Sequence, residues 1–374
     1  MKIAVLKEAD GEARCAAIPE TVKKYIALGA EVAVEHGAGD GASIADSEFE
    51  AAGAKLGSRV EVLNDAGIIL AINGPDPVSL KGAASDALLA GALDPLRRRD
   101  TIDGYAAAGL QALAMEWMPR ITRAQSMDIL SSQSNLAGYK AVIEAAAAYG
   151  RAFPMMMTAA GTIAAAKVFV MGVGVAGLQA IATARRLGAV VTATDVRPAT
   201  KEQVESLGAK FLAVEDEEFK NAQTAGGYAK EMSKEYQAKQ AELVSGHIAK
   251  QDIVITTALI PGRPAPRLVT AAQVASMKPG SVLIDLAVEQ GGNVEGAKAG
   301  EVVVTKNGVK IVGIANMAGQ VAADASALYA RNLVNFCTLL VDKEGKFAPA
   351  WEDEILKAAL LTRDGAVVHT GLKG

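Results

Sequence analysis

KVFVMGVGVAGLQAIATARRLGAVVTATDVR, residues 167–197, is the stretch that decides the fold of this 374-residue chain. An apolar run, 168–171, precedes three closely spaced glycines, an amphipathic segment and a second apolar run that ends at Asp195. This order predicts a strand, a tight turn, a helix and a second strand, with an acid about 20 residues after the turn. A glycine triplet alone is a weak signal. With the strand, the helix and the acid around it, the pattern is typical of a dinucleotide-binding unit.

Each glycine has a separate role in such a unit. Gly172 permits the tight turn, Gly174 lets the backbone approach a pyrophosphate, and Gly177 lets the helix pack closely on the strand. The pyrophosphate would lie against the free N–H groups at the helix start. Asp195 can accept hydrogen bonds from an adenosine ribose and repel a 2′-phosphate, whereas Arg197 would attract that phosphate. Because the carboxylate at the strand end usually dominates, we predict NAD(H) at this site.

Composition narrows the functional classes. The chain is 51% hydrophobic and 21% charged, which is typical of a compact globular protein. A net charge of −4 and an aromatic content of 4% argue against nucleic acid as a partner. The only two cysteines are Cys15 and Cys337, and the three histidines stand far apart in the sequence. We therefore expect no disulfide framework, no metal site and a reducing, cytoplasmic compartment.

Strand-like and helix-like segments alternate along the chain, which favours α/β architecture with parallel sheets. The strands are expected at 2–7, 31–36, 68–73, 111–117, 168–171, 190–194, 253–258 and 282–286. The segment 216–250 is long for a connection, so it is either a helical excursion or a mobile lid. A helix is expected over Val321–Val341, and the short tail after it should return to the first domain. The predicted boundaries are 1–130 with 320–374 for a discontinuous first domain, and 131–319 for an inserted dinucleotide-binding domain.

One stretch raises the alternative of a membrane span. Residues 152–184 carry a single charge, Lys167, so hydropathy alone would flag them. Glycine and proline interrupt the run, and its second half is the dinucleotide motif itself. A buried parallel strand is equally apolar because helices cover both of its faces. We therefore expect no direct insertion into a membrane.

A second polar constellation lies at the junction of the two blocks, PRITRAQSMDILSSQSN at 119–135. Domain junctions are where clefts form. Arg120 and Asp128 could pair across the loop, while Gln125 and Ser131 offer donors to a carboxamide or a ribose. The alternative is a solvated hinge followed by a helix that one of the hydroxyls of 131–134 caps. Residue chemistry alone leaves both interpretations open.

The block 120–140, RITRAQSMDILSSQSNLAGYK, closely resembles the proton-translocating NAD(P) transhydrogenases, in particular their NAD(H)-binding component. The resemblance continues through FPMMMTAAGT (153–162), GVGVAGLQAIATA (172–184), ATDVRPATKEQVESLG (193–208), TAGGYAKEM (224–232), TTALIPGRPAP (256–266) and MKPGSVLIDLAVE (277–289). It covers essentially the whole chain, and the 120–140 block is highly specific.

The resemblance implies a fold, a cofactor and partners. The fold would be α/β, with two Rossmann-like doubly wound domains, a cleft between them and the second domain inserted into the first. The chain would act as a homodimer that binds NAD(H). NADP(H) would be held on a partner subunit and the proton path by a membrane-spanning subunit, so this chain would be peripheral on the cytosolic face of the inner membrane.

The resemblance also assigns residues. The loop that orients the nicotinamide end would supply the catalytic residues Arg120, Gln125, Asp128 and Ser131, with cofactor contacts from Ile121 and Thr122. Further cofactor contacts would come from Val175 near the pyrophosphate, from Asp195, Val196 and Arg197 around the ribose, from the mobile loop at Gly227 and Tyr228, and from Gln240 and Leu259.

Three segments depart from the family pattern. The lysine expected within LAINGP (70–75) and the histidine expected within ALLAGALD (87–94) are both missing. The related alanine dehydrogenases use these two residues to bind and protonate pyruvate, so reductive amination would lack its general acid. The third segment, ANMAGQVAADAS (315–326), stands where the family shows TNVPSR.

The leading hypothesis is therefore direct hydride transfer between NADH on this chain and NADP⁺ on a partner, which needs orientation and no general acid. Two alternatives stay open. One is a soluble oxidoreductase of the alanine dehydrogenase kind, and the other is a non-catalytic NAD-sensing module.

Overall fold

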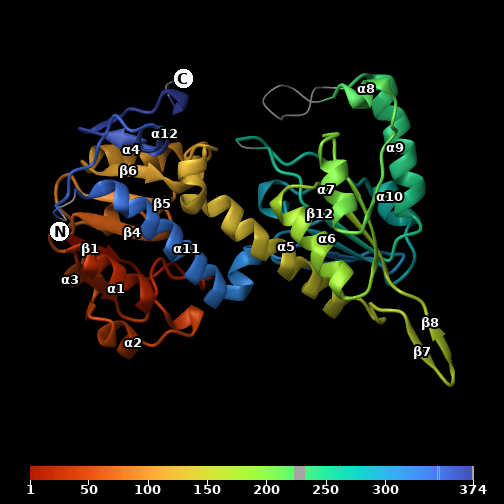
Figure 1. The fold of residues 1–374 in the computed structure, drawn as a ribbon, viewed down its shortest axis with the longest axis horizontal. Coiled ribbons are helices and arrows are strands. Elements are labelled where there is room, and N and C mark those ends of the chain that lie inside the picture. Colours follow the sequence, from red (N-terminus) through yellow and green to blue (C-terminus); the bar gives the residue numbers. More distant parts are fainter. Residues whose placement is uncertain (223–231, 261, 343, 345, 373–374) are drawn as a thin grey trace. The chain divides into compact units, whose positions relative to one another are not determined.

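The computed structural model describes residues 1–222, 232–260, 262–342, 344 and 346–372. The chain divides into two compact units, residues 1–133 with 318–374 and residues 134–317 (Figure 1). Helix α5 (Ile129–Ala148) begins in the first unit and continues in the second. Each unit holds a largely parallel sheet covered by helices, so the predicted α/β class with two Rossmann-like domains is confirmed.

The first unit is built on a six-stranded parallel sheet of order β3-β2-β1-β4-β5-β6. Its strands are β1 (Lys2–Val5), β2 (Glu31–Glu35), β3 (Lys55–Gly57), β4 (Ile68–Asn73), β5 (Leu88–Ala92) and β6 (Gln111–Ala114). The helices of the unit are α1 (Pro19–Ala27), α2 (Asp46–Ala51), α3 (Arg59–Leu63), α4 (Arg99–Ala107), α11 (Ala322–Cys337) and α12 (Glu354–Ala359). The order reverses between β1 and β4, which is where an open sheet of this kind forms a crevice.

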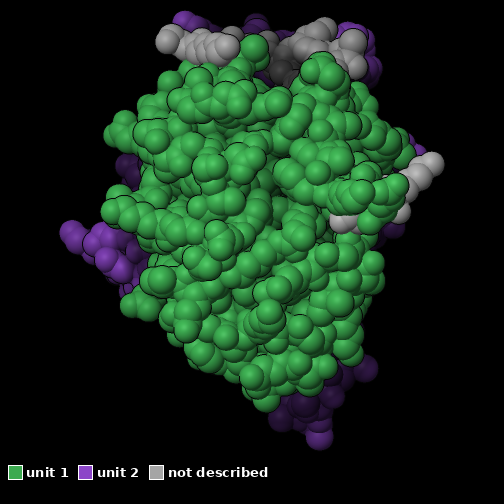
Figure 2. All heavy atoms as spheres, turned by 90° about the vertical axis from the view of Figure 1, so that its left-hand side faces the viewer, with its two compact units in different colours: residues 1–133, 318–374 green, residues 134–317 purple. Residues whose placement is uncertain are grey.

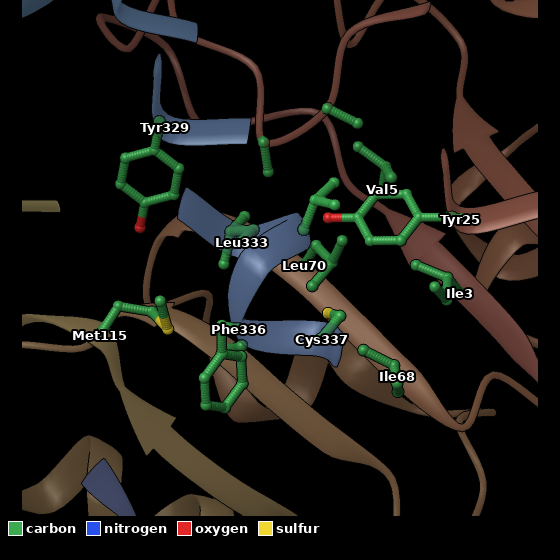
Figure 3. Close-up of a cluster of buried hydrophobic side chains, with 14 of the residues drawn as sticks. Ile3, Val5, Tyr25, Ile68, Leu70, Met115, Tyr329, Leu333, Phe336 and Cys337 are labelled. Atoms are coloured by element: carbon green, nitrogen blue, oxygen red, sulfur yellow. The ribbon is translucent and has the colours of Figure 1, made fainter. Parts of the chain in front are cut away.

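Helix α11 covers this sheet with one apolar face. Tyr329, Leu333, Phe336 and Cys337 lie four, three and one positions apart, so they share a side of the helix, and all four are buried. Figure 3 shows them beside the buried strand residues of β1 and β4, including Val5. A segment more than 300 residues from the first strand thus completes the core of that strand.

The chain's last residues also belong to the first unit. The N–H of Leu361 donates to the carbonyl of Ala112 on β6, and the Thr362 hydroxyl donates to the carbonyl of Leu110. The short hairpin β16 (Thr362–Arg363) and β17 (Ala366–Val367) follows. Figure 2 draws both stretches of this unit, residues 1–133 and 318–374, in green.

The second unit has a seven-stranded sheet of order β11-β10-β9-β12-β13-β15-β14, parallel except for β14 at its edge. Its strands are β9 (Lys167–Met171), β10 (Val190–Thr194), β11 (Lys210–Phe211), β12 (Ile253–Thr256), β13 (Val282–Asp285), β14 (Val302–Val304) and β15 (Lys310–Val312). Its helices are α6 (Val175–Arg186), α7 (Thr200–Ser206), α8 (Glu217–Lys220), α9 (Lys234–Ile248) and α10 (Ala271–Ser276). A separate hairpin, β7 (Met156–Thr158) and β8 (Gly161–Ile163), extends from the body of this unit (Figure 1).

The sequence located eight strands of the two large sheets and missed the others. The eight expected strands are present, although β6 ends at Ala114 where 117 was predicted. Strands β3, β5, β11, β14 and β15 of the two large sheets were not predicted, nor were the hairpin strands β7, β8, β16 and β17. The segment 216–250 contains α8 and α9, as one of its two interpretations required, while 223–231 lies outside the described residues.

Both cysteines are buried in the core of the first unit as free thiols. Burial raises the pKa of Cys15 and of Cys337 to about 12, because an apolar core disfavours the thiolate. Among the described residues, no helix combines the length and apolar character needed to cross a bilayer.

Candidate functional site

The glycine turn lies at the reversal point of the second sheet, between β9 and β12. Gly172 has a φ of +100°, which favours glycine. A Cβ added there would lie 2.6 Å from the Thr257 hydroxyl oxygen, and that hydroxyl donates to the Gly172 carbonyl over 3.0 Å. The Gly172 N–H donates to Thr194 at the end of β10. The turn is therefore fixed to both neighbouring strands, and only glycine fits it.

Gly177 and Gly174 shape the turn in different ways. A Cβ on Gly177 would overlap the carbonyl oxygen of Gly172, so the absence of a side chain lets α6 approach β9. A Cβ on Gly174 would meet nothing within 4 Å, so the protein itself does not require glycine there. Gly174 is the N-cap of α6 with an extended backbone and a φ of −81°, and the space beside it is open to a ligand.

The start of α6 offers free hydrogen-bond donors. No side chain caps it, and its first turn carries no acidic residue. The first N–H groups of a helix have no partners inside the helix, and the helix dipole favours negative charge at that end. The turn and the helix start together offer the kind of donors that a pyrophosphate would need.

Asp195 is more heavily engaged than the sequence indicated. Its carboxylate accepts from the Val173 N–H over 2.8 Å, which ties it to the glycine turn. It also accepts from the Arg197 N–H over 2.9 Å and from the Arg197 guanidinium over 2.8 and 2.9 Å. These hydrogen bonds raise the pKa of Arg197. The carboxylate thus neutralises Arg197, a cation that would otherwise attract a 2′-phosphate.

The other predicted contacts of the second unit divide into exposed and structural residues. Val175, Val196 and Leu259 are large apolar residues exposed by 39%, 63% and 46%, so their side chains are accessible to a ligand. Gln240 has partners within the protein: its side-chain oxygen accepts from the Val214 N–H, and its amide nitrogen donates to the Thr194 hydroxyl. Gly227 and Tyr228 lie outside the described residues.

The polar loop of the first unit is a 3₁₀ helix, Thr122–Met127. A 3₁₀ helix repeats every three residues, so Ile121, Ala124 and Met127 share one face. Ala124 and Met127 are buried, and Ile121 packs against the same core. This apolar face packs the 3₁₀ helix against the core of the first unit. Thr122 and Gln125 are exposed on the other sides of the helix.

Asp128 and Ser131 contact each other at the start of α5. The Asp128 carboxylate accepts from the Ser131 N–H over 3.0 Å and from the Ser131 hydroxyl over 2.5 Å. Asp128 therefore caps α5, and the prediction that one of the hydroxyls of 131–134 would do so was wrong. Because α5 begins at Ile129, Asp128 stands at the N-cap position and Ser131 is already the third helical residue, whose N–H the cap accepts from.

The prediction that Arg120 and Asp128 form an ion pair was also wrong. Within the described part of the chain no ion pair joins them, and Arg120 is exposed. A different arginine is anchored in this loop: Arg123 donates to the Asp353 carboxylate over 2.9 Å and to Glu354 over 3.2 Å. Asn332 and Asn335 of α11 both donate to the Ser126 carbonyl. The sequence carried no signal for these anchors, since they lie about 200 residues from the loop.

Comparison with known proteins identifies the family. The chain matches the models "Alanine dehydrogenase/PNT, N-terminal domain" over residues 4–137 and "Alanine dehydrogenase/PNT, C-terminal domain" over residues 141–370. The chain belongs to the alanine dehydrogenase/PNT family. A relative from Rhodospirillum rubrum, an NAD(P) transhydrogenase subunit alpha, is 56% identical over 384 aligned positions, which cover 100% of this chain and 99% of the relative.

Two solved structures are similar to this chain and agree with the family assignment. The crystal structure of transhydrogenase from Sinorhizobium meliloti is 58% identical, has a TM-score of 0.90, and is matched over 98% of this chain and 100% of that one. An L-alanine dehydrogenase structure is 25% identical with a TM-score of 0.82, over 100% of this chain and 98% of that one. Within the family, the chain is thus a homologue of transhydrogenase alpha subunits.

At the carboxyl edge of the first sheet, side chains that follow β1 hydrogen-bond to residues at the end of β4. Glu12 pairs with Arg14 through two hydrogen bonds of 2.8 and 2.7 Å, and it accepts from the Asn73 amide over 3.0 Å. Glu8 accepts from the N–H groups of Ile72 and Asn73, and burial raises its pKa to about 7. The residues that follow β1 and β4 thus satisfy one another at this edge. Among the described residues, no group of three or more His, Cys, Asp or Glu is arranged to hold a metal ion.

Proposed function

We propose that this chain is the NAD(H)-binding component of a proton-translocating NAD(P) transhydrogenase. It would exchange a hydride directly between NADH and NADP⁺ held by a partner subunit. The observation that carries the proposal is the uncapped, glycine-lined start of α6, in a chain homologous over its full length to transhydrogenase alpha subunits. The turn residues, the exposed apolar side chains and Asp195 are the groups that would hold NAD(H).

The chemistry asked of the protein is orientation. Bound NAD(H) supplies the hydride. The residues of 120–131 would hold the nicotinamide within roughly 3–3.5 Å of the acceptor ring. Gln125, exposed on the 3₁₀ helix, and Ser131, braced by Asp128, are the proposed ring contacts. Arg120, which is exposed, would steady the carboxamide end or the partner's surface.

Two features argue against free-standing alanine dehydrogenase activity. The segment 70–75 contributes the end of β4 and Asn73 where a lysine was expected, and the segment 87–94 forms β5 without a histidine. Reductive amination would then lack a general acid. The isolated chain should therefore show no NADH oxidation that depends on pyruvate and ammonia.

The decisive experiment mixes the purified chain with the NADP(H)-binding component of a related transhydrogenase. Hydride transfer from NADH to an NADP-site acceptor is followed spectroscopically, with each component alone as control. Transfer only in the mixture supports the proposal. NADH binding with no transfer in the mixture would favour an NAD-sensing module instead.

Replacing Arg120 by alanine is expected to separate binding from transfer. NADH affinity should stay within about twofold, whereas the transfer rate should fall about 10- to 100-fold, because small misplacements of reacting groups are costly. Parallel NADH titrations and rate assays measure the two effects. Arg186→Ala, an exposed arginine at the far end of α6, is the matched control and should change neither. Equal losses of binding and rate in Arg120→Ala would rule out the orienting role.

The proposed homodimer finds support in the hairpin β7–β8. All six residues of its two strands are exposed, and Met155, Met156 and Met157 expose 57%, 40% and 79% of their surface. A lone two-stranded hairpin is marginally stable, so an apolar one is expected to pack against another surface. We propose a second copy of this chain as that surface.

Met157→Glu should therefore convert the dimer to a monomer in analytical ultracentrifugation, because a carboxylate would be buried without a partner. Val60→Glu is the control: Val60 is 74% exposed on α3 and should tolerate the charge without any change in mass. A wild-type chain that sediments as a monomer would end the dimer proposal.

The remaining assignments follow from the same proposal. NADP(H) and the membrane-spanning path for protons would reside on partner subunits. This chain would associate with the cytoplasmic face of the inner membrane through those partners.

A further inference from the structure

One buried side chain, that of Asn332, hydrogen-bonds to the residues that follow the two proposed ring contacts. Gln125 precedes Ser126, and Ser131 precedes Ser132. The Asn332 amide group of α11 donates to the Ser126 carbonyl over 2.8 Å, and its oxygen accepts from the Ser132 hydroxyl over 2.7 Å. Asn332 is only 7% exposed.

The geometry defines the orientation of this amide. A carbonyl oxygen can only accept, so the atom that faces Ser126 must be the Asn332 nitrogen. The amide oxygen is then left to accept from the Ser132 hydroxyl, and both ends of the side chain are satisfied. No other uncharged side chain of similar size offers a donor and an acceptor in this spacing.

Position and burial distinguish Asn332 from its neighbour Asn335. Asn335 lies one turn later on α11 and donates to the same Ser126 carbonyl over 3.1 Å, but it is partly exposed and does not contact Ser132. Of the two asparagines, Asn332 alone bonds both to the 3₁₀ helix and to the first turn of α5. Gln125 lies in the first of these segments and Ser131 in the second.

We propose that Asn332 is a positioning residue for hydride transfer: it fixes the spacing between Gln125 and Ser131 by clamping the main chain at Ser126 and the side chain of Ser132. The inference rests on the proposed function. It concerns the first unit alone, because all five residues belong to that unit.

Four variants test the two hydrogen bonds of Asn332, to Ser126 and to Ser132. Asn332→Leu removes both bonds while keeping the branched shape of the side chain. Asn332→Asp keeps the acceptor for Ser132 and places an oxygen against the Ser126 carbonyl. Ser132→Ala leaves the bond to Ser126 and removes the bond to the Asn332 oxygen, together with the hydroxyl's contacts to the Ile129 carbonyl and the Gln133 amide. Asn335→Leu is the matched control, because the Ser126 carbonyl keeps its bond to Asn332.

Two quantities are measured for each variant: the NADH dissociation constant, and kcat for hydride transfer with the partner component. Both are measured at a temperature well below the thermal unfolding midpoint of the variant. Asn332→Leu and Asn332→Asp should lower kcat about tenfold or more with the NADH dissociation constant within about twofold. Ser132→Ala should lower kcat by a smaller factor, and Asn335→Leu should resemble wild type. A purely structural role would lower the unfolding midpoint and leave kcat unchanged, and that result would overturn the inference.

Hydrogen exchange gives a second measurement that needs no activity. The amides of 120–132 should exchange faster in Asn332→Leu and in Ser132→Ala than in Asn335→Leu. If Asn332→Leu does not fold, Ser132→Ala decides: unchanged exchange and unchanged kcat would refute the clamp. If the wild-type chain shows no transfer, the proposed function fails, while the exchange data still report whether the clamp exists.

Discussion

Replacing Gly177 by alanine should abolish measurable NADH binding. The added Cβ would overlap the carbonyl oxygen of Gly172, which is backbone and cannot rotate away. Relief requires α6 to move off β9 or the turn to open, at a cost of about 3 kcal/mol or more. Because the same shift displaces the donors at the start of α6, affinity should fall at least about 100-fold. Fluorescence titration with NADH and thermal unfolding would measure both effects.

The neighbouring glycines provide controls for this experiment. Gly174→Ala introduces a Cβ with nothing within 4 Å, so stability should be unchanged while a pyrophosphate that approaches the turn is hindered. Gly246→Ala, in open space on α9, should leave binding unchanged and stabilise the helix by about 0.5–1 kcal/mol. Normal NADH binding by Gly174→Ala would mean that the pyrophosphate does not lie against this turn.

Asp195→Ala should reverse the nucleotide preference. The change removes the acceptor for the ribose and the charge that repels a 2′-phosphate, and it frees the Arg197 guanidinium from its hydrogen bonds to the carboxylate. Loss of a hydrogen bond to a charged group costs about 1.5–3 kcal/mol, so NADH affinity should fall roughly 10- to 100-fold while NADPH affinity rises. Titration with both nucleotides gives the ratio.

Arg197→Ala is the partner experiment. Asp195 then keeps its bond to the Val173 N–H, so the turn is preserved and NADH should bind about as well as to wild type. Comparable weakening of NADH and NADPH by Asp195→Ala would show instead that the carboxylate matters through the turn alone, and that nucleotide choice is made elsewhere.

Much of the buried α/β framework could be predicted, because the central strands of the second sheet are nearly continuous apolar runs. Residues 168–171 and 253–256 are buried along their whole length, so composition alone indicates them. Strand β5, LLAGA, was missed because alanine and glycine carry little strand preference, and tertiary packing alone makes this segment a strand. The two-residue β11 is too short to leave a pattern.

The parts of the candidate site that depend on backbone conformation could be predicted from the sequence. The side-chain hydrogen bonds were harder to predict. The roles of Gly172 and Gly177 follow from sterics that any such turn shares. The partner of Asp128 did not follow, because Ser131 and Arg120 were both within reach of it in sequence and only the fold decides between them. Asn332 could not have been found from the loop, since nothing in the sequence links residue 332 to residues 126 and 132.

The two buried thiols make this chain well suited to site-specific labelling. A maleimide reacts with the thiolate, and at neutral pH neither Cys15 nor Cys337 presents one, because both are enclosed and their pKa is about 12. A single cysteine introduced at the exposed Gln125 would therefore be the only group to take up a fluorophore, with the native cysteines left in place. Such a probe would report in real time on the loop's surroundings as nucleotide and partner arrive.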